Sequence, residues 1–130
     1  LIKLGSKKVV FVHSADGLDE VSPAAPTQVF EYIENRDMKR YEIRPTEFYP
    51  LELVRGGGVE ENTARTLTIL SGQGTPAETA FLSLNAGLAL YTAGEVSSVF
   101  EGKILAEKVI HSGFAKKKLD EVVTVTQSLS

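Results

Sequence analysis

The stretch VVFVHSADGLDE, residues 9–20, decides the fold class that the sequence predicts. Val9 to Val12 form an unbroken run of β-branched and aromatic residues, which is typical of a strand covered on both faces, as in a parallel sheet. The run is followed by a loop that contains three carboxylates and a glycine. Because ligands of open α/β sheets bind outside the carboxyl ends of the strands, this loop is the first candidate for a functional site.

The composition fits one compact unit. The chain has 130 residues, of which 42% are hydrophobic and 24% are charged, and this is enough for one buried core. Its formal net charge is −3 without a basic stripe, which disfavours binding to nucleic acid and to acidic membranes. The absence of cysteine removes disulfides and thiolate metal sites, and the apolar stretches are too short to span a bilayer. We therefore expect a soluble, cytoplasmic protein.

Two features indicate that the chain is a piece of a longer protein. The opening residues LIKLG look like the last turn of an apolar-faced helix followed by Gly5, and a domain rarely starts where a helix ends. A parallel strand also needs parallel neighbours, and no other run in the sequence offers one. We expect the rest of the sheet to lie upstream.

The remaining sequence predicts a hairpin and then helices. Residues 27–33 alternate apolar and polar side chains, and Tyr41 and Ile43 resume the alternation after the turn-like ENRD. Thr75 to Glu78, TPAE, is the clearest local signal, because it combines an N-cap, a proline at the first helical position and a capping box. Helices are predicted at residues 59–70, 76–93, 99–111 and 115–123, and the second of them is apolar on nearly every side, as in the centre of a core. The predicted class is α/β, with a parallel strand, a β-hairpin and several C-terminal helices.

The acidic loop suggests a metal site. Adjacent carboxylates such as Asp19 and Glu20 can converge on one cation when a glycine starts their loop. Sites with few carboxylates suit Mg²⁺, which keeps much of its water and takes further ligands from substrate phosphates. The alternative is that these acids are simply solvated, because short acidic motifs often occur by chance.

Four other polar features have a functional and a structural interpretation. His13 stands at the strand end, where it either acts as a general base near the cation or ties the strand to the loop. Gly56–Gly58 precede a helix and either cradle an anion or form a flexible helix start; the Lys-Ser/Thr of a phosphate loop is absent. For Asn85 we expect a buried structural hydrogen bond, and for His111 a favourable charge in the last turn of a helix.

Three segments together resemble a known family. They are VHSADGLDEVSP (12–23), GGGVEENTARTLTILSGQ (56–73) and FLSLNAGLALYTAGEVSSVFEGKILAEKVIHSG (81–113). In order and spacing they resemble the C-terminal part of anthranilate phosphoribosyltransferase, whose pattern has a Gly-Leu-Asp-Glu loop and an Asn-Ala-(small)-Ala-Leu-Tyr helix. The resemblance implies that residues 1–130 form the C-terminal portion of one α/β domain of the nucleoside phosphorylase/phosphoribosyltransferase type.

The resemblance also implies a reaction. In this family the amine of anthranilate displaces pyrophosphate from C1 of phosphoribosyl pyrophosphate (PRPP), a step of tryptophan biosynthesis. The implied cofactor is Mg²⁺, and the family's metal-binding Asp-Glu pair falls on Asp19 and Glu20. The implied partners are the two small-molecule substrates, PRPP and anthranilate, and a second copy of the full-length protein in a homodimer.

The sequence departs from the family pattern in several places. Ser14 stands where the family commonly has a glycine, and Gly58 and Val59 replace an Asp-Pro helix start. The family's glycine-rich phosphate loop, anthranilate-contacting residues and N-terminal helical domain are not in this chain, so we expect the chain alone to be inactive. Two alternatives remain: a non-catalytic structural or binding module of the same superfamily, and a related pyrimidine nucleoside phosphorylase.

Overall fold

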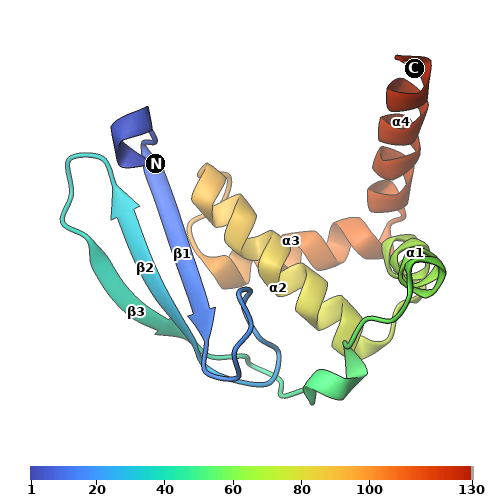
Figure 1. Ribbon diagram of the computed structural model, residues 1–130, viewed down its shortest axis with the longest axis horizontal. Helices are drawn as coiled ribbons and strands as arrows, with labels where there is room; N and C mark the ends of the chain where they lie inside the picture. Colours follow the sequence, from blue (N-terminus) through green and yellow to red (C-terminus); the bar gives the residue numbers. More distant parts are fainter. Residues whose placement is uncertain (130) are drawn as a thin grey trace.

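The structure is a computed structural model that describes residues 1–129 and places helices against a three-stranded sheet (Figure 1). The strands are β1 (Lys8–Ser14), β2 (Thr27–Ile33) and β3 (Lys39–Ile43), in the order β1-β2-β3. The helices are α1 (Val59–Thr68), α2 (Pro76–Ala93), α3 (Val99–His111) and α4 (Phe114–Ser128), with short 3-10 turns at Ile2–Leu4 and Leu51–Leu53 and a π-helical turn at Ile69–Gln73. The predicted α/β class, the hairpin and the C-terminal helices are confirmed.

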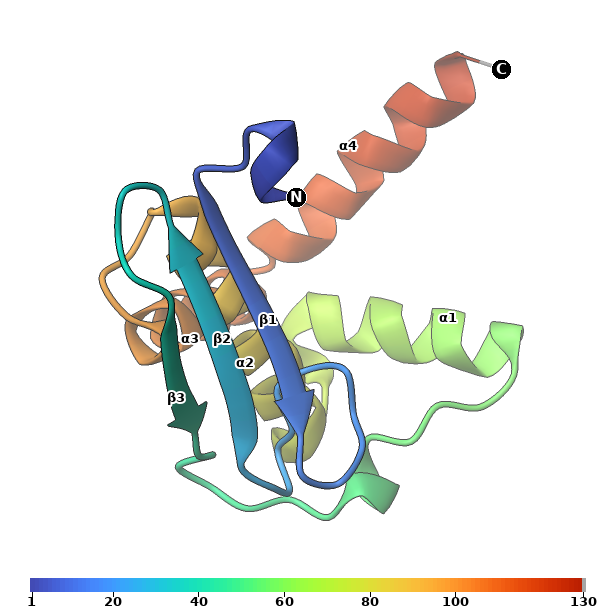
Figure 2. The same cartoon turned by 60° about the vertical axis from the view of Figure 1, so that its left-hand side comes forward.

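The sequence predicts parallel neighbours for the first strand, β1, upstream of this chain, and that stays a prediction; within residues 1–129, β1 has one neighbour. Its neighbour β2 runs antiparallel to it, with Phe11 opposite Phe30, because the loop of residues 15–26 reverses the chain. Helices cover one face of the sheet within residues 1–129 (Figure 2), so the side chain of Phe11 on the other face is 57% exposed. A parallel partner for β1 is not among the described strands.

The core lies between the sheet and α2. Its buried cluster comprises Val21, Val29, Ile43, Leu84 and Val99. Val29 and Ile43 come from adjacent strands, whereas Val21 comes from the loop after β1. The acidic loop is therefore anchored in the core immediately beyond its carboxylates.

The central helix α2 has the ends that the sequence predicts. Thr75 accepts a hydrogen bond from the backbone of Glu78, whose carboxylate accepts one in return from the backbone of Thr75. Gly94 ends the helix in the left-handed conformation, with φ of 85°. These caps fix both the start and the length of the helix that carries Asn85.

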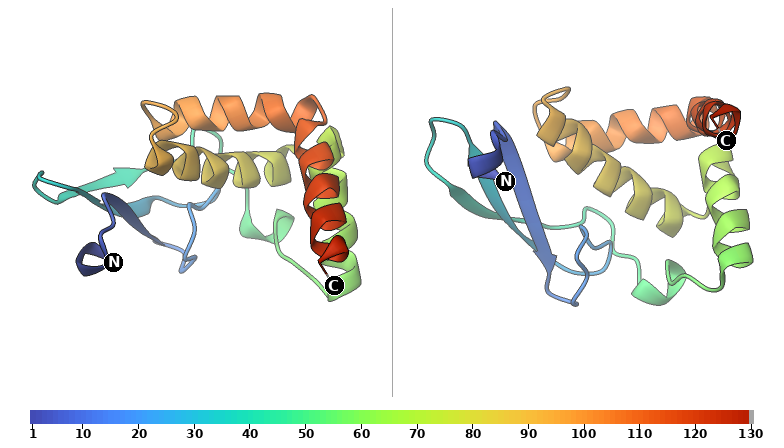
Figure 3. Two further views of the ribbon diagram at one scale, coloured as in Figure 1. Left: turned by 90° about the horizontal axis from the view of Figure 1, so that it is seen from above. Right: turned by 45° about the horizontal axis from the view of Figure 1, so that its top comes forward.

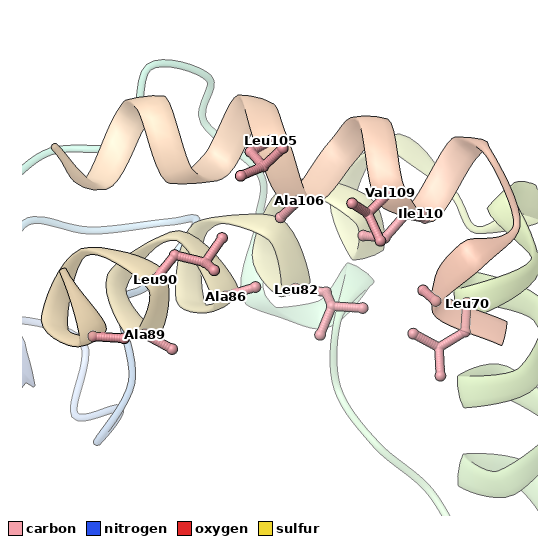
Figure 4. Close-up of a pocket in the computed structure, with 11 residues that line it drawn as sticks. Leu70, Leu82, Ala86, Ala89, Leu90, Leu105, Ala106, Val109 and Ile110 are labelled. Atoms are coloured by element: carbon pink, nitrogen blue, oxygen red, sulfur yellow. The ribbon is translucent and has the colours of Figure 1, made fainter. Parts of the chain in front are cut away.

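Figure 3 shows α2 and α3 between the sheet and the two outer helices, α1 and α4. One side of α2 faces the sheet, as predicted for a core helix. Another side is open: Leu82 and Leu90 line an apolar groove of about 580 Å³ together with Leu105 and Val109 of α3 (Figure 4). Among residues 1–129, every helix is too short or too polar to cross a membrane.

Candidate functional site

The loop after β1 is held in shape by its own backbone. The amide of Ser14 donates to the carbonyl of Leu18 at 2.9 Å, and the amide of Ala15 donates to the carbonyl of Pro26 at 2.9 Å. Gly17 adopts φ of 94°, a conformation that glycine enters without steric cost. The turn at Gly17 lets the chain double back, so that the next carboxylates follow directly at the end of the strand.

Asp16 is committed to this loop. Its carboxylate accepts a hydrogen bond from the hydroxyl of Ser22 at 2.5 Å and one from the amide of Leu18 at 3.4 Å. Partial burial raises the pKa of Asp16, but hydrogen bonds from Ser22 and Ser14 outweigh this effect and hold the pKa below its ordinary value. Asp16 therefore stabilises the fold of the loop, which leaves Asp19 and Glu20 as the two carboxylates available to a ligand.

Asp19 and Glu20 form an exposed pair of adjacent carboxylates. Partial desolvation, followed by the charge of Asp19, raises the pKa of Glu20 above its ordinary value, as expected for two like charges at close range. A divalent cation relieves such repulsion, and carboxylate oxygens are the ligands that Mg²⁺ prefers. Within the described chain, no cluster of three or more carboxylate, imidazole or thiolate groups could hold a metal ion. The pair thus fits a cation that takes its other ligands from water and substrate.

Asn85 connects this loop to α2. Its side-chain oxygen accepts a hydrogen bond from the amide of Val21 at 2.8 Å, and its side-chain nitrogen donates to the carbonyl of Val21 at 2.9 Å. The same nitrogen donates to the carbonyl of Phe81 at 3.0 Å. The predicted structural hydrogen bond of Asn85 is confirmed, and its partner is the residue next to Glu20.

A cleft of about 490 Å³ adjoins the carboxylate pair. Glu20, Asn85 and Phe81 line it on one side, and Asn62, Arg65 and Thr66 of α1 line it on the other. Arg65 is bound to three protein groups: its guanidinium contacts the Glu78 carboxylate at 2.5 Å and the backbone carbonyls of Arg55 and Leu53. Sequence reasoning missed this Arg65–Glu78 pair, because the two residues belong to different helices and neither has a local signal that points to the other.

The other residues that the sequence singled out, two histidines and three glycines, are not part of the carboxylate pair. His13 is exposed on β1 opposite Gln28, and its ring makes no hydrogen bond within residues 1–129. The amide and the carbonyl of Gly57 are both bonded to the side chain of Asn62, at 2.8 and 3.0 Å. Gly58 then caps α1, so the interpretation as a helix start is confirmed, and the side chain of Asn62 takes the Gly57 amide that an anion cradle would need. His111 lies in the last turn of α3, as predicted.

Comparison with known proteins gives the family. The profile described as the glycosyl transferase family, a/b domain, matches residues 1–116. The chain belongs to this family. Curated relatives in it include the anthranilate phosphoribosyltransferase of Chromobacterium violaceum, 39% identical over 97% of this chain and 37% of that protein. The anthranilate phosphoribosyltransferase of Methanobrevibacter smithii is 40% identical over 98% of this chain and 39% of that protein.

Solved structures of this glycosyl transferase family agree. The anthranilate phosphoribosyltransferase of Thermus thermophilus superimposes with a TM-score of 0.84 and 31% identity, over 95% of this chain and 36% of that chain. The Saccharomyces cerevisiae enzyme in complex with PRPP and Mg superimposes with a TM-score of 0.82 and 26% identity, over 92% of this chain and 35% of that chain. The predicted resemblance is confirmed, and the chain spans less than two fifths of the length of each of these relatives.

Proposed function

We propose that the complete protein transfers the phosphoribosyl group from PRPP to anthranilate and releases pyrophosphate. We further propose that residues 1–130 are the C-terminal portion of its α/β domain and carry its metal-binding pair, Asp19 and Glu20. The observation that carries this proposal is the exposed pair of carboxylates at the end of β1, in a chain similar over nearly its whole length to anthranilate phosphoribosyltransferases. A relative in this family was solved with PRPP and Mg together.

In the proposed reaction the amine nitrogen of anthranilate attacks C1 of PRPP, the bond from C1 to the pyrophosphate oxygen breaks, and the nitrogen loses a proton. Asp19 and Glu20 are the residues that would hold Mg²⁺. Held there, a divalent cation would supply charge that offsets part of the negative charge on the departing pyrophosphate. Asp16 keeps the loop folded by accepting a hydrogen bond from the hydroxyl of Ser22.

An assay of the complete protein tests this proposal. PRPP, anthranilate and Mg²⁺ are supplied, and the loss of anthranilate is compared with the release of pyrophosphate, which should match it mole for mole. Asp19→Asn and Glu20→Gln should each lower the rate by roughly 100-fold at limiting Mg²⁺, because each removes one charge from the pair. Asp37→Asn, in the exposed turn between β2 and β3, is the matched control and should keep the wild-type rate.

The two alternatives are tested by this assay together with a second one that supplies a pyrimidine nucleoside and inorganic phosphate. A protein that consumes neither substrate behaves as a non-catalytic module, and a protein that cleaves a pyrimidine nucleoside with inorganic phosphate is a nucleoside phosphorylase. Unchanged rates and unchanged Mg²⁺ dependence in both acid variants would refute the assignment of the metal pair.

The proposal also includes a homodimer and a cytoplasmic location for the complete protein. Light scattering coupled to size-exclusion chromatography should give twice the mass of one chain. Cell fractionation should recover the protein with the cytoplasmic fraction.

A further inference from the structure

We infer that Asn85 is a positioning residue, which holds the Asp19–Glu20 pair in place for a divalent cation by clamping the backbone of Val21. The inference deepens the proposed function and rests on the metal site assigned there. It assigns to a helix residue distant in sequence a role in the affinity of the loop for metal.

The geometry of the clamp is reciprocal. The side-chain oxygen of Asn85 lies 2.8 Å from the amide nitrogen of Val21, and its side-chain nitrogen lies 2.9 Å from the carbonyl oxygen of the same residue. One amide group thus satisfies both backbone groups of Val21, as a neighbouring strand would. The third bond, to the carbonyl of Phe81 at 3.0 Å, fixes the amide against its own helix. Three of its four hydrogen-bonding positions are therefore used, and the side chain has little freedom to rotate.

Val21 links the clamp to the carboxylates. Its side chain is fully buried and belongs to the core cluster, so the residue is fixed through both its side chain and its backbone. Glu20 precedes it directly, so the clamped amide nitrogen belongs to the peptide bond that joins Glu20 to Val21.

The carboxylates themselves need such support. Both are exposed and adjacent in sequence, and two like charges at close range repel each other. Two like charges on an unsupported loop relax away from each other, whereas a cation binds best when its ligands are already convergent. Groups that orient the ligands of a metal are worth roughly 10- to 100-fold in its affinity.

The test measures the binding of Mn²⁺ alone to the complete protein. The concentration of free Mn²⁺ is monitored by its electron paramagnetic resonance signal. Asn85→Ala should weaken Mn²⁺ binding about tenfold or more. Ser83→Ala is the matched control on α2: it also removes a buried polar group, whose hydroxyl donates to Ala80 at 3.2 Å and to Glu107 at 3.3 Å, but it leaves the clamp intact. Its Mn²⁺ affinity should equal that of the wild type. Circular dichroism verifies folding, and Asn85→Ser, which keeps a polar group at the site, is measured if the alanine variant does not fold.

Each outcome is decisive. Wild-type Mn²⁺ affinity in a folded Asn85 variant, or an equal loss in Ser83→Ala, would overturn the role of Asn85. A wild-type protein that binds Mn²⁺ through Asp19 but does not transfer phosphoribosyl groups would refute the proposed function and leave the clamp standing. A wild-type protein that does not bind Mn²⁺ would overturn the role of Asn85, whereas the proposed function is decided separately by the transfer assay.

Discussion

Replacing Gly87 with alanine tests how closely α2 and α3 cross. The two helices meet at Gly87 and Gly102, and a β-carbon added at Gly87 would lie 2.5 Å from the carbonyl oxygen of Val99 and 2.5 Å from the amide nitrogen of Lys103. Ordinary contacts of a β-carbon begin at 3.4 Å, so the helices would have to move apart by 3.4 − 2.5 = 0.9 Å. The obstructing atoms are helical backbone, which cannot rotate away as a side chain can.

The magnitude follows from two opposed effects. Alanine favours the helix over glycine by about 1 kcal/mol. Overpacking a close contact costs about 1–3 kcal/mol, and backbone neighbours place this site at the upper end. The free energy of unfolding should therefore fall by about 2 kcal/mol on Gly87→Ala.

Urea denaturation of the complete protein measures this change, with the slope of the transition expected to stay constant. The control is Ala89→Gly, an exposed position two residues along the same helix, which should lose about 1 kcal/mol from helix propensity alone. If Gly87→Ala instead raised the free energy of unfolding by about 1 kcal/mol, helix propensity would dominate. That result would refute the close crossing of α2 and α3.

Two further predictions concern buried carboxylates. Burial raises the pKa of Glu78, but hydrogen bonds from Thr75 and the Arg65 guanidinium outweigh this effect and hold the pKa below its ordinary value of 4.5. A lowered pKa stabilises the folded state above pH 4.5 and ceases to do so as the pH falls through the folded value, so Glu78→Gln should destabilise the protein at pH 7 by more than at pH 3 in thermal unfolding. Tyr91→Phe removes the hydroxyl that donates to Glu31 at 2.8 Å, and because Glu31 is only 3% exposed, urea denaturation should show a loss of about 1–3 kcal/mol. An unchanged midpoint in Tyr91→Phe would mean that water replaces the hydroxyl at no cost.

Features that depend on neighbours in sequence were predicted well. Thr75 and Glu78 are three residues apart, and the geometry of one helical turn suffices to make them a capping box. The loop carboxylates were also found in sequence, because they follow directly on an apolar run. Local chemistry determines these features, so no knowledge of the tertiary fold was needed.

Features that depend on contacts between residues distant in sequence were not predicted. An apolar run such as Val9 to Val12 reports which side chains avoid water, but not the direction of the strand beside it, so the antiparallel pairing of β1 with β2 was not predicted. The need of Asn85 for a partner was evident from its apolar surroundings, yet Val21 lies 64 residues away. Tertiary packing alone brings Asn85 and Val21 together. The same contact places α2 beside the loop that carries the two carboxylates.

The central claim is that Asp19 and Glu20 bind a divalent cation beside the substrate. Anomalous diffraction from crystals of the complete protein grown with Mn²⁺ and PRPP tests it most directly. The account predicts one anomalous peak bonded to a carboxylate oxygen of each residue, at about 2.1 Å, with a pyrophosphate oxygen among its remaining ligands. A manganese ion bound to PRPP with both carboxylates out of reach would contradict it.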